Sequence, residues 1–128
     1  MSRLALDTNA VSALFDGDEA LLDVLGDSER LALPIIVVGE YRFGLQRSRH
    51  RGQLAALLEA LVHDTEVLEV DLETTRTYAA VREALRVRGH PLPENDVWIA
   101  ALCRQHGLDL VTRDRDFAHV EGLHTRAW

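Results

Sequence analysis

The segment "PLPENDVWIAALCRQHGLDLVTRDRDF" (residues 91–117) shows the pattern from which the fold class follows. After the helix breaker Pro93 it predicts an apolar helix that ends at Gly107, then a strand over residues 108–112 and an acidic turn. A helix repeats about every 3.6 residues, so residues three, four and seven positions apart lie on one face. Asp96, in the first turn, therefore shares a face with the apolar residues Ile99, Ala100 and Cys103. The segment combines an α/β unit with an acid that faces the expected core.

The same alternation of strands and helices continues over the rest of the chain. Residues 30–48 are ambiguous, because the β-branched run 35–38 favours a strand while Pro34 suits the first turn of a helix. We favour a strand at 30–33 and a helix from about 34 to 48. The other predicted elements are a strand at "RLAL", a helix at "DTNAVSALF", a helix over 52–63, a strand over 66–71, a helix over 73–89 and a short strand in "GLHTRAW". This order predicts an α/β fold with a parallel sheet covered on both faces.

Length and composition restrict the class of protein. The chain has 128 residues, which suits a single domain over residues 1–128 and is too short for two. No apolar run approaches the roughly 18 residues of a membrane span, and "MSRLALDTN" is too poor in apolar residues for a signal peptide. The one cysteine, Cys103, excludes an internal disulfide and a cysteine-based metal cage. We therefore expect a soluble, cytoplasmic protein.

The charged residues exclude further classes. The net charge is −7, and all 14 basic residues are arginine, so chemistry that requires a lysine is excluded. Residues 16–29 carry six acids and no base, which is typical of a solvated helical face. A net acidic chain lacks the long-range field of a tight DNA binder. Three alternatives stay open: the protein binds no nucleic acid, it binds nucleic acid weakly through a local basic patch, or bound cations reduce its net negative charge.

Five acids lie where a parallel α/β sheet places its sites, at the carboxyl ends of strands. Asp7 follows the first strand, Asp114 and Asp116 follow the strand 108–112, Asp96 opens the helix before that strand, and Glu40 lies in the helix 34–48. Each acid alone has an ordinary explanation as a helix cap, a solvated residue or the partner of a nearby arginine. Together they repel one another, and a divalent cation such as Mg²⁺ would relieve that repulsion. Such a site activates water for attack at phosphorus.

Other active-site patterns do not fit. The chain contains neither of the glycine-rich phosphate-binding motifs, GxxxxGK[ST] and GxGxxG, and no G-x-S-x-G nucleophile motif. We interpret the six histidines as surface or loop-end residues. The acidic cluster is the candidate site.

Four motifs of this chain resemble the PIN domain, and more narrowly the VapC-type toxin ribonucleases of bacterial toxin–antitoxin pairs. They are "LALDTNAVSALF", "GEYRFGL", "ENDVWIAALCRQHGLDLVTRDRDF" and "VEGL". The resemblance covers nearly the whole chain. It implies a PIN-like α/β/α sandwich with a central parallel sheet, and endoribonuclease activity that depends on Mg²⁺ or Mn²⁺. It also implies a homodimer and inhibition by a VapB-like antitoxin.

The resemblance assigns roles to particular positions. Asp7, Glu40 and Asp96 match the acids of the family, and the fourth acid is Asp114 or Asp116, of which we favour Asp114 because it is closer to the strand end. Three further residues match polar positions that hydrogen-bond the carboxylates or metal-bound water: Asn9, Ser12 and Thr112.

RNA contact is assigned to the densest basic run of the chain, which contains Arg42, Arg47, Arg49, His50 and Arg51. Arginine suits phosphate recognition, although arginines near a helix end are equally explained by the negative end of the helix dipole. Two alternatives to a toxin stay open at this point. One is a PIN-domain ribonuclease of RNA maturation, and the other is a non-catalytic binding module.

Overall fold

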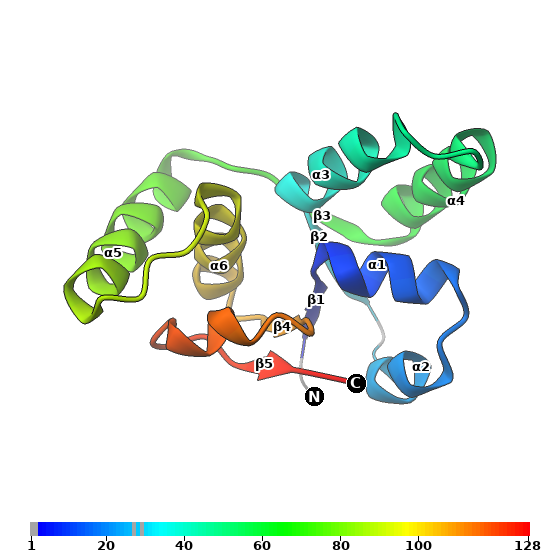
Figure 1. Ribbon diagram of the computed structural model, residues 1–128. Coiled ribbons are helices and arrows are strands. Elements are labelled where there is room, and N and C mark those ends of the chain that lie inside the picture. Colours follow the sequence, from blue (N-terminus) through cyan, green and yellow to red (C-terminus); the bar gives the residue numbers. More distant parts are fainter. Residues whose placement is uncertain (1–2, 27, 29) are drawn as a thin grey trace.

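Five parallel strands form the central sheet of the computed structural model, which describes residues 3–26, 28 and 30–128 (Figure 1). They are β1 (Leu4–Leu6), β2 (Leu31–Pro34), β3 (Glu66–Leu68), β4 (Asp109–Val111) and β5 (Thr125–Arg126). Their order in the sheet is β3-β2-β1-β4-β5, and every pairing is parallel. The predicted parallel sheet is confirmed, and β1 lies at its centre between β2 and β4.

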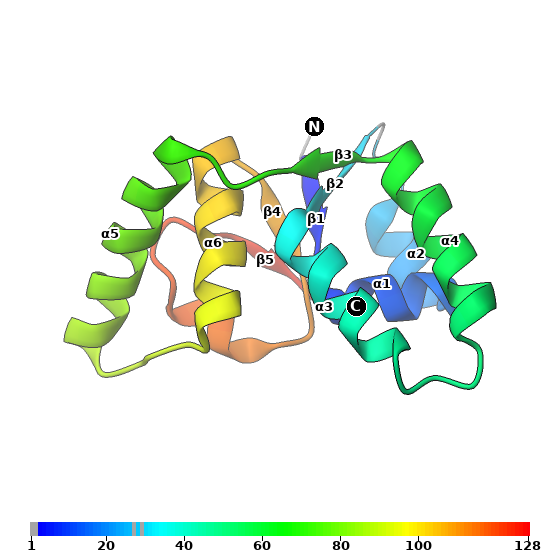
Figure 2. The same ribbon diagram turned by 90° about the horizontal axis from the view of Figure 1, so that it is seen from above.

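Within the described ranges, six α-helices flank the sheet. They are α1 (Thr8–Phe15), α2 (Glu19–Leu25), α3 (Ile35–Leu45), α4 (Arg51–Asp64), α5 (Leu72–Arg88) and α6 (Glu94–His106), with a short 3₁₀ helix η1 (Arg115–His119) before β5. Figures 1 and 2 place α5 and α6 on one side of β1 and β2, and α1, α2 and α4 on the other. The α/β/α arrangement predicted from the sequence is confirmed. None of the helices in the described ranges is long and apolar enough to cross a membrane.

The helix α6 supplies much of the core, as its periodicity predicts. Ile99, Ala100 and Cys103 have no exposed surface, and burial raises the pKa of the Cys103 thiol to about 12. The helix ends at Gly107, whose φ of 67° is a left-handed conformation that favours glycine. The first turn carries Asp96 to the edge of the sheet where the other acids lie.

Several predicted boundaries need correction. The β-branched run after Pro34 is helical, as we favoured, although α3 ends at Leu45 and not near 48. The strand predicted over 66–71 ends at Leu68, because Asp71 is the N-cap of α5. The acidic helix in 16–29 is α2, with Leu21 and Leu25 buried. Two of its acids, Asp27 and Glu29, lie outside the described residues.

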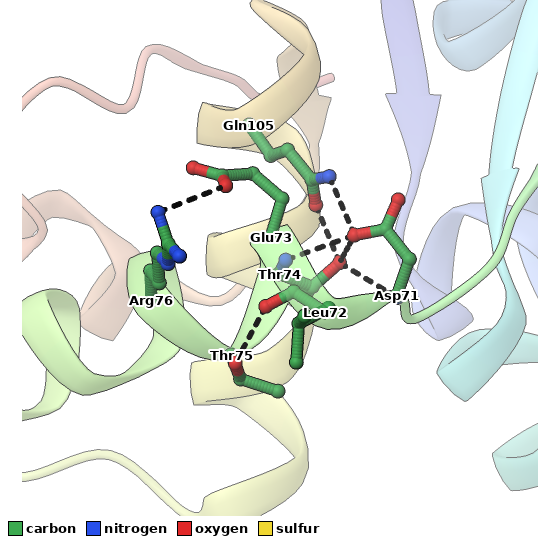
Figure 3. A network of polar contacts seen from close by, with 7 residues as sticks. All are labelled: Asp71, Leu72, Glu73, Thr74, Thr75, Arg76 and Gln105. Atoms are coloured by element: carbon green, nitrogen blue, oxygen red, sulfur yellow. Dashed lines mark hydrogen bonds and ion pairs between the residues drawn. The ribbon is translucent and has the colours of Figure 1, made fainter.

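Asp71 also ties α5 to α6 (Figure 3). Its Oδ1 accepts hydrogen bonds from the Thr74 main-chain N–H and from Gln105 Nε2 of α6, both at 3.0 Å. The Thr74 Oγ1 accepts the Asp71 main-chain N–H in return, at 3.0 Å, which completes a capping box. The hydrogen bonds to the carboxylate lower the pKa of Asp71, the one from Thr74 N–H most of all.

Replacing Asp71 by Ala is expected to lower the melting temperature by roughly 3–6 °C at neutral pH, because the helix loses its cap and α6 loses a partner. A carboxyl with a lowered pKa in the folded state contributes stability above its unfolded pKa, and that contribution is lost as the pH falls through the folded value. The difference between wild type and variant should therefore shrink below about pH 3.8. Thermal melting followed by circular dichroism from pH 3 to pH 8 checks both points. A constant difference across this range would contradict the assignment.

Candidate active site

The pairing of β1 with β4 brings the first two site residues together. Asp7 follows β1, and its main-chain N–H donates to the Val111 carbonyl at the end of β4, at 3.1 Å. The next residue along, Thr112, donates from Oγ1 to Asp7 Oδ2 at 2.7 Å. Asp7 also caps α1, because its Oδ1 accepts the Thr8 main-chain N–H at 2.8 Å. The Asp7 side chain is thereby fixed at the carboxyl edge of the sheet, with only 5% of the residue exposed.

The Thr112 hydroxyl takes part in three hydrogen bonds of the site. Because a carboxylate only accepts, the Thr112 hydroxyl donates to Asp7 and has its acceptor sites left for other donors. It accepts from Asn9 Nδ2 at 3.3 Å and from the Asp114 main-chain N–H at 3.0 Å. Two of the three predicted polar positions, Asn9 and Thr112, thus lie against the acids. The third, Ser12, is exposed on α1 and makes no hydrogen bond to these carboxylates in the described part of the chain.

Glu40 reaches the site from α3. The Thr8 hydroxyl, at the start of α1, donates to Glu40 Oε1 at 2.9 Å. A groove of about 670 Å³ opens beside this pair and is lined by Thr8, Ile35, Ile36, Gly39, Glu40, Phe43 and Asn95. Thr8 is a site residue that the sequence analysis did not single out. Its position next to Asp7 was the available signal, but a threonine in the first turn of a helix is ordinary.

Asp96 joins the same cluster from the first turn of α6. It is half-buried, and burial is the largest cause that raises its pKa, to about 6. The charges of Asp7, Glu40, Asp114 and Asp116 raise the pKa of Asp96 further. Burial likewise raises the pKa of Asp7, against the hydrogen bonds from Thr112 and Thr8, with Glu40 and Asp114 adding to the rise. The five acids predicted from the sequence therefore act on one another at one end of the sheet.

Asp114 lies deeper in the cluster than Asp116. Asp114 caps η1, with its Oδ1 accepting the Asp116 main-chain N–H at 2.9 Å, and it is half-buried while Asp116 is exposed. The charge of Asp114 raises the pKa of both Asp7 and Asp96, whereas that of Asp116 is the weakest of the four charges that raise the pKa of Asp96. This geometry favours Asp114 over Asp116 as the fourth acid of the site.

Among the residues that the structure describes, no basic side chain balances the charge of the cluster. In the described part of the chain, no ion pair includes any of the five acids. Arg113, which follows Thr112 directly, points to Asp18 and Trp128 instead of to Asp114. The ordinary explanation of Asp114 as the partner of this neighbouring arginine is therefore not supported.

The donor set fits a hard divalent cation. Mg²⁺ and Mn²⁺ favour carboxylate oxygens, and Mg²⁺ keeps several of its waters, so few direct protein ligands are needed. As the side chains of the described residues stand, no three acids, histidines or cysteines are arranged around one point that could hold a metal ion. A cation would therefore be held partly through water, or after small rotations of the carboxylates.

The predicted RNA-binding arginines divide into two kinds. Arg42 forms an ion pair with Glu59 of α4 at 2.8 Å, and the Arg47 guanidinium lies 5.5 Å from the centre of the Phe43 ring. Arg49 and Arg51 are exposed and form no ion pair with another described residue. Arg51 begins α4, where the helix dipole is unfavourable to a cation, so the dipole does not explain it.

Comparison with known proteins identifies the family of this chain. The PIN domain family matches residues 4–123, a range that includes all five acids. The ribonuclease VapC5 of Mycobacterium tuberculosis is 35% identical over 123 residues, which cover 91% of this chain and 87% of that protein.

Solved structures show the same fold. The toxin–antitoxin system VapBC-5 of Mycobacterium tuberculosis is 31% identical with a TM-score of 0.77, over 99% of this chain and 98% of that one. VapBC2 of Rickettsia felis, bound to a DNA fragment from its promoter, has a TM-score of 0.86 over 98% of both chains. Its identity of 23% makes it a likeness of fold alone. The resemblance found in the sequence is confirmed: this chain belongs to the PIN-domain family and, within it, to the VapC group.

Proposed function

We propose that this chain is the endoribonuclease toxin of a VapBC-type toxin–antitoxin pair, and that it hydrolyses RNA phosphodiester bonds with Mg²⁺ or Mn²⁺. The observation that carries the proposal is the cluster of carboxylates at the carboxyl edge of the sheet, around Asp7 and Asp96, which form no ion pair with another described residue. Relatives named VapC ribonucleases support the class of substrate. The proposal includes a single domain over residues 1–128 and a cytoplasmic location.

The site residues divide the work in this proposal. Asp7, Glu40, Asp96 and Asp114 hold the cation, directly or through water, with Asp116 beside them. A cation held there would lower the pKa of a bound water and stabilise negative charge at the phosphate. Thr112 fixes the orientation of the Asp7 carboxylate by donating to Oδ2, while the Thr8 main-chain N–H donates to Oδ1. The Thr8 hydroxyl fixes the orientation of Glu40 by donating to its Oε1.

The direct test is cleavage of single-stranded RNA by the purified chain in Mg²⁺ or Mn²⁺, with a chelator as the control. Cleavage that persists after the metal is removed would contradict the proposal. Expression of the gene alone, compared with expression beside the neighbouring gene, distinguishes a toxin from a nuclease of RNA maturation. Growth arrest is expected only from the toxin, and only in the absence of its partner.

Neutralising the basic run is expected to weaken RNA binding and to flatten its salt dependence. Each phosphate contact contributes about 0.7 to the slope of log K against log salt on single strands, so Arg47→Gln, Arg49→Gln and Arg51→Gln together should reduce the slope by roughly 2. Fluorescence anisotropy of a labelled RNA at several salt concentrations measures it. Arg76→Gln on α5, outside the basic run, is the control for the loss of an exposed arginine, since Arg76 pairs with Glu73. An unchanged slope in the triple variant would remove these arginines from the RNA contact.

The partners in this proposal are an antitoxin and a second copy of the chain. The cluster of carboxylates suits an arginine inserted by another protein, which would displace the cation or its water. Co-purification of the two proteins after their genes are expressed together tests the antitoxin.

Support for a homodimer comes from exposed apolar side chains on α3, where Phe43 is 67% and Ile35 is 38% exposed. Sedimentation of wild type and Phe43→Ser tests whether this surface joins two copies.

A further inference from the structure

Arg113 is held by three groups, none of which belongs to the five acids of the site. Its Nε donates to the Trp128 main-chain carbonyl at 3.2 Å, and its guanidinium carbon lies 4.5 Å from the centre of the Trp128 ring. A third partner is Asp18, the N-cap of α2, whose Oδ2 lies 3.8 Å from Arg113 Nη2. An arginine over an indole face is a favourable cation–π pair. Trp128 therefore restrains the Arg113 side chain, which remains about half exposed.

The main chain around Arg113 carries the site. The Arg113 main-chain N–H donates to Asn9 Oδ1 at 3.4 Å. On either side of it, Thr112 donates to Asp7 and the Asp114 N–H donates to Thr112 Oγ1. The turn 112–114 is thus hydrogen-bonded to Asp7 and Asn9 at the acidic cluster, and the Arg113 side chain connects the same turn to Trp128.

The indole is not held in place by its own hydrogen bond. Trp128 packs partly buried against the core, and its Nε1 is buried without a hydrogen-bond partner in the part of the chain that the structure describes. A buried N–H without a partner is unfavourable, so the contribution of Trp128 lies in its ring and not in that polar atom. A phenylalanine would keep a ring face for Arg113 and remove the unsatisfied N–H.

We propose that Trp128 is a positioning residue of the acidic site, acting through Arg113 to hold the turn that presents Thr112 and Asp114 beside Asp7. This inference rests on the proposed metal-dependent function, because the turn matters chemically only if the acids hold a cation. Removing a residue that hydrogen-bonds or orients a metal ligand commonly lowers metal affinity or activity by about 10- to 100-fold.

The test compares Trp128→Ala, Trp128→Phe and Arg113→Gln with wild type. For each protein, the Mn²⁺ concentration that gives half of the rise in melting temperature is measured, together with kcat and KM for one RNA. Trp128→Ala and Arg113→Gln are expected to need about 10-fold more Mn²⁺ and to lose kcat with little change in KM. Trp128→Phe is expected to stay near wild type.

Two further comparisons keep the result interpretable. Val62→Ala truncates a partly buried side chain in α4, a helix that contacts α3 and β3, and is expected to lower the melting temperature without moving the Mn²⁺ midpoint. If Trp128→Ala does not fold, Arg113→Gln carries the test, since that side chain is about half exposed. An unchanged Mn²⁺ midpoint in Arg113→Gln, or a phenylalanine variant as impaired as the alanine one, overturns the positioning role. A wild type that neither responds to Mn²⁺ nor cleaves RNA overturns the proposed function, and the inference with it.

Discussion

Replacing Asp7 by Asn is expected to reduce RNA cleavage by at least about 100-fold while the fold is kept. The asparagine has nearly the same shape, and its Oδ1 can accept the Thr8 N–H, so the α1 cap survives while the hydrogen bond from Thr112 to the second oxygen is lost. The loss is one negative charge at the most buried of the five acids. Initial rates on a defined RNA in Mg²⁺ and in Mn²⁺ measure the effect, and circular dichroism verifies the fold.

The matched control for this substitution is Asp23→Asn, which removes the same charge from the exposed face of α2. It changes the net charge equally and leaves the cluster intact, so its cleavage rate should stay close to that of wild type. Full activity of Asp7→Asn would remove Asp7 from the metal site. A similar loss in both variants would instead indicate an effect of overall charge.

Local patterns in the sequence predict the framework of this site well. The apolar periodicity of residues 94–106, the stop at Gly107 and the acids that follow two strands are all local features, and they predict the parallel sheet and the edge where Asp7, Asp96 and Asp114 gather. Burial patterns repeat along a helix or strand, so they can be recognised without knowledge of distant contacts. The family resemblance supported a helix over a strand at 35–45 and matched Glu40 to an acid of the family.

Contacts between residues far apart in the sequence could not be predicted in this way. Thr8 meets Glu40 across 32 positions, and Asp71 meets Gln105 across 34. Arg42 belongs to a basic run in the sequence, yet Glu59 on the next helix pairs with it. Such partners depend on how the helices pack on the sheet, so neither composition nor period identifies them.

In the absence of metal, Asp96→Asn is expected to be more stable than wild type at pH 7.5, by about 1–2 kcal/mol. The pKa of Asp96 rises from 3.8 to about 6 on folding, because burial and the neighbouring carboxylates oppose its ionised form. Two pH units correspond to roughly 3 kcal/mol, which partial exposure of the carboxyl reduces. Asparagine carries no charge and avoids this cost. The melting temperature should rise by several degrees, as measured in a buffer that contains a chelator.

The pH dependence of stability distinguishes a charge effect at Asp96 from a packing effect. A carboxyl whose pKa is raised in the folded state binds more protons folded than unfolded, so wild-type stability falls relative to the variant as the pH rises from about 4 to 6. Below about pH 3.8 the wild-type carboxyl is protonated in both the folded and the unfolded state, and the advantage of Asp96→Asn should vanish. Above about pH 6 it should be constant. An advantage that is independent of pH would point to better packing, and a variant less stable than wild type would show that Asp96 serves α6 chiefly as a first-turn acid.

Adding metal should reverse the order of the two proteins. A cation that binds only the folded state stabilises it in proportion to the logarithm of its concentration over Kd, about 2.7 kcal/mol at 100 times Kd. If the four proposed acids hold the cation, wild type gains this stabilisation at lower Mn²⁺ than Asp96→Asn does. The same carboxylate thus lowers stability without the cation and raises it with the cation. If Mn²⁺ leaves the order unchanged at concentrations that support cleavage, Asp96 is not a ligand, and the cost of its burial has another cause.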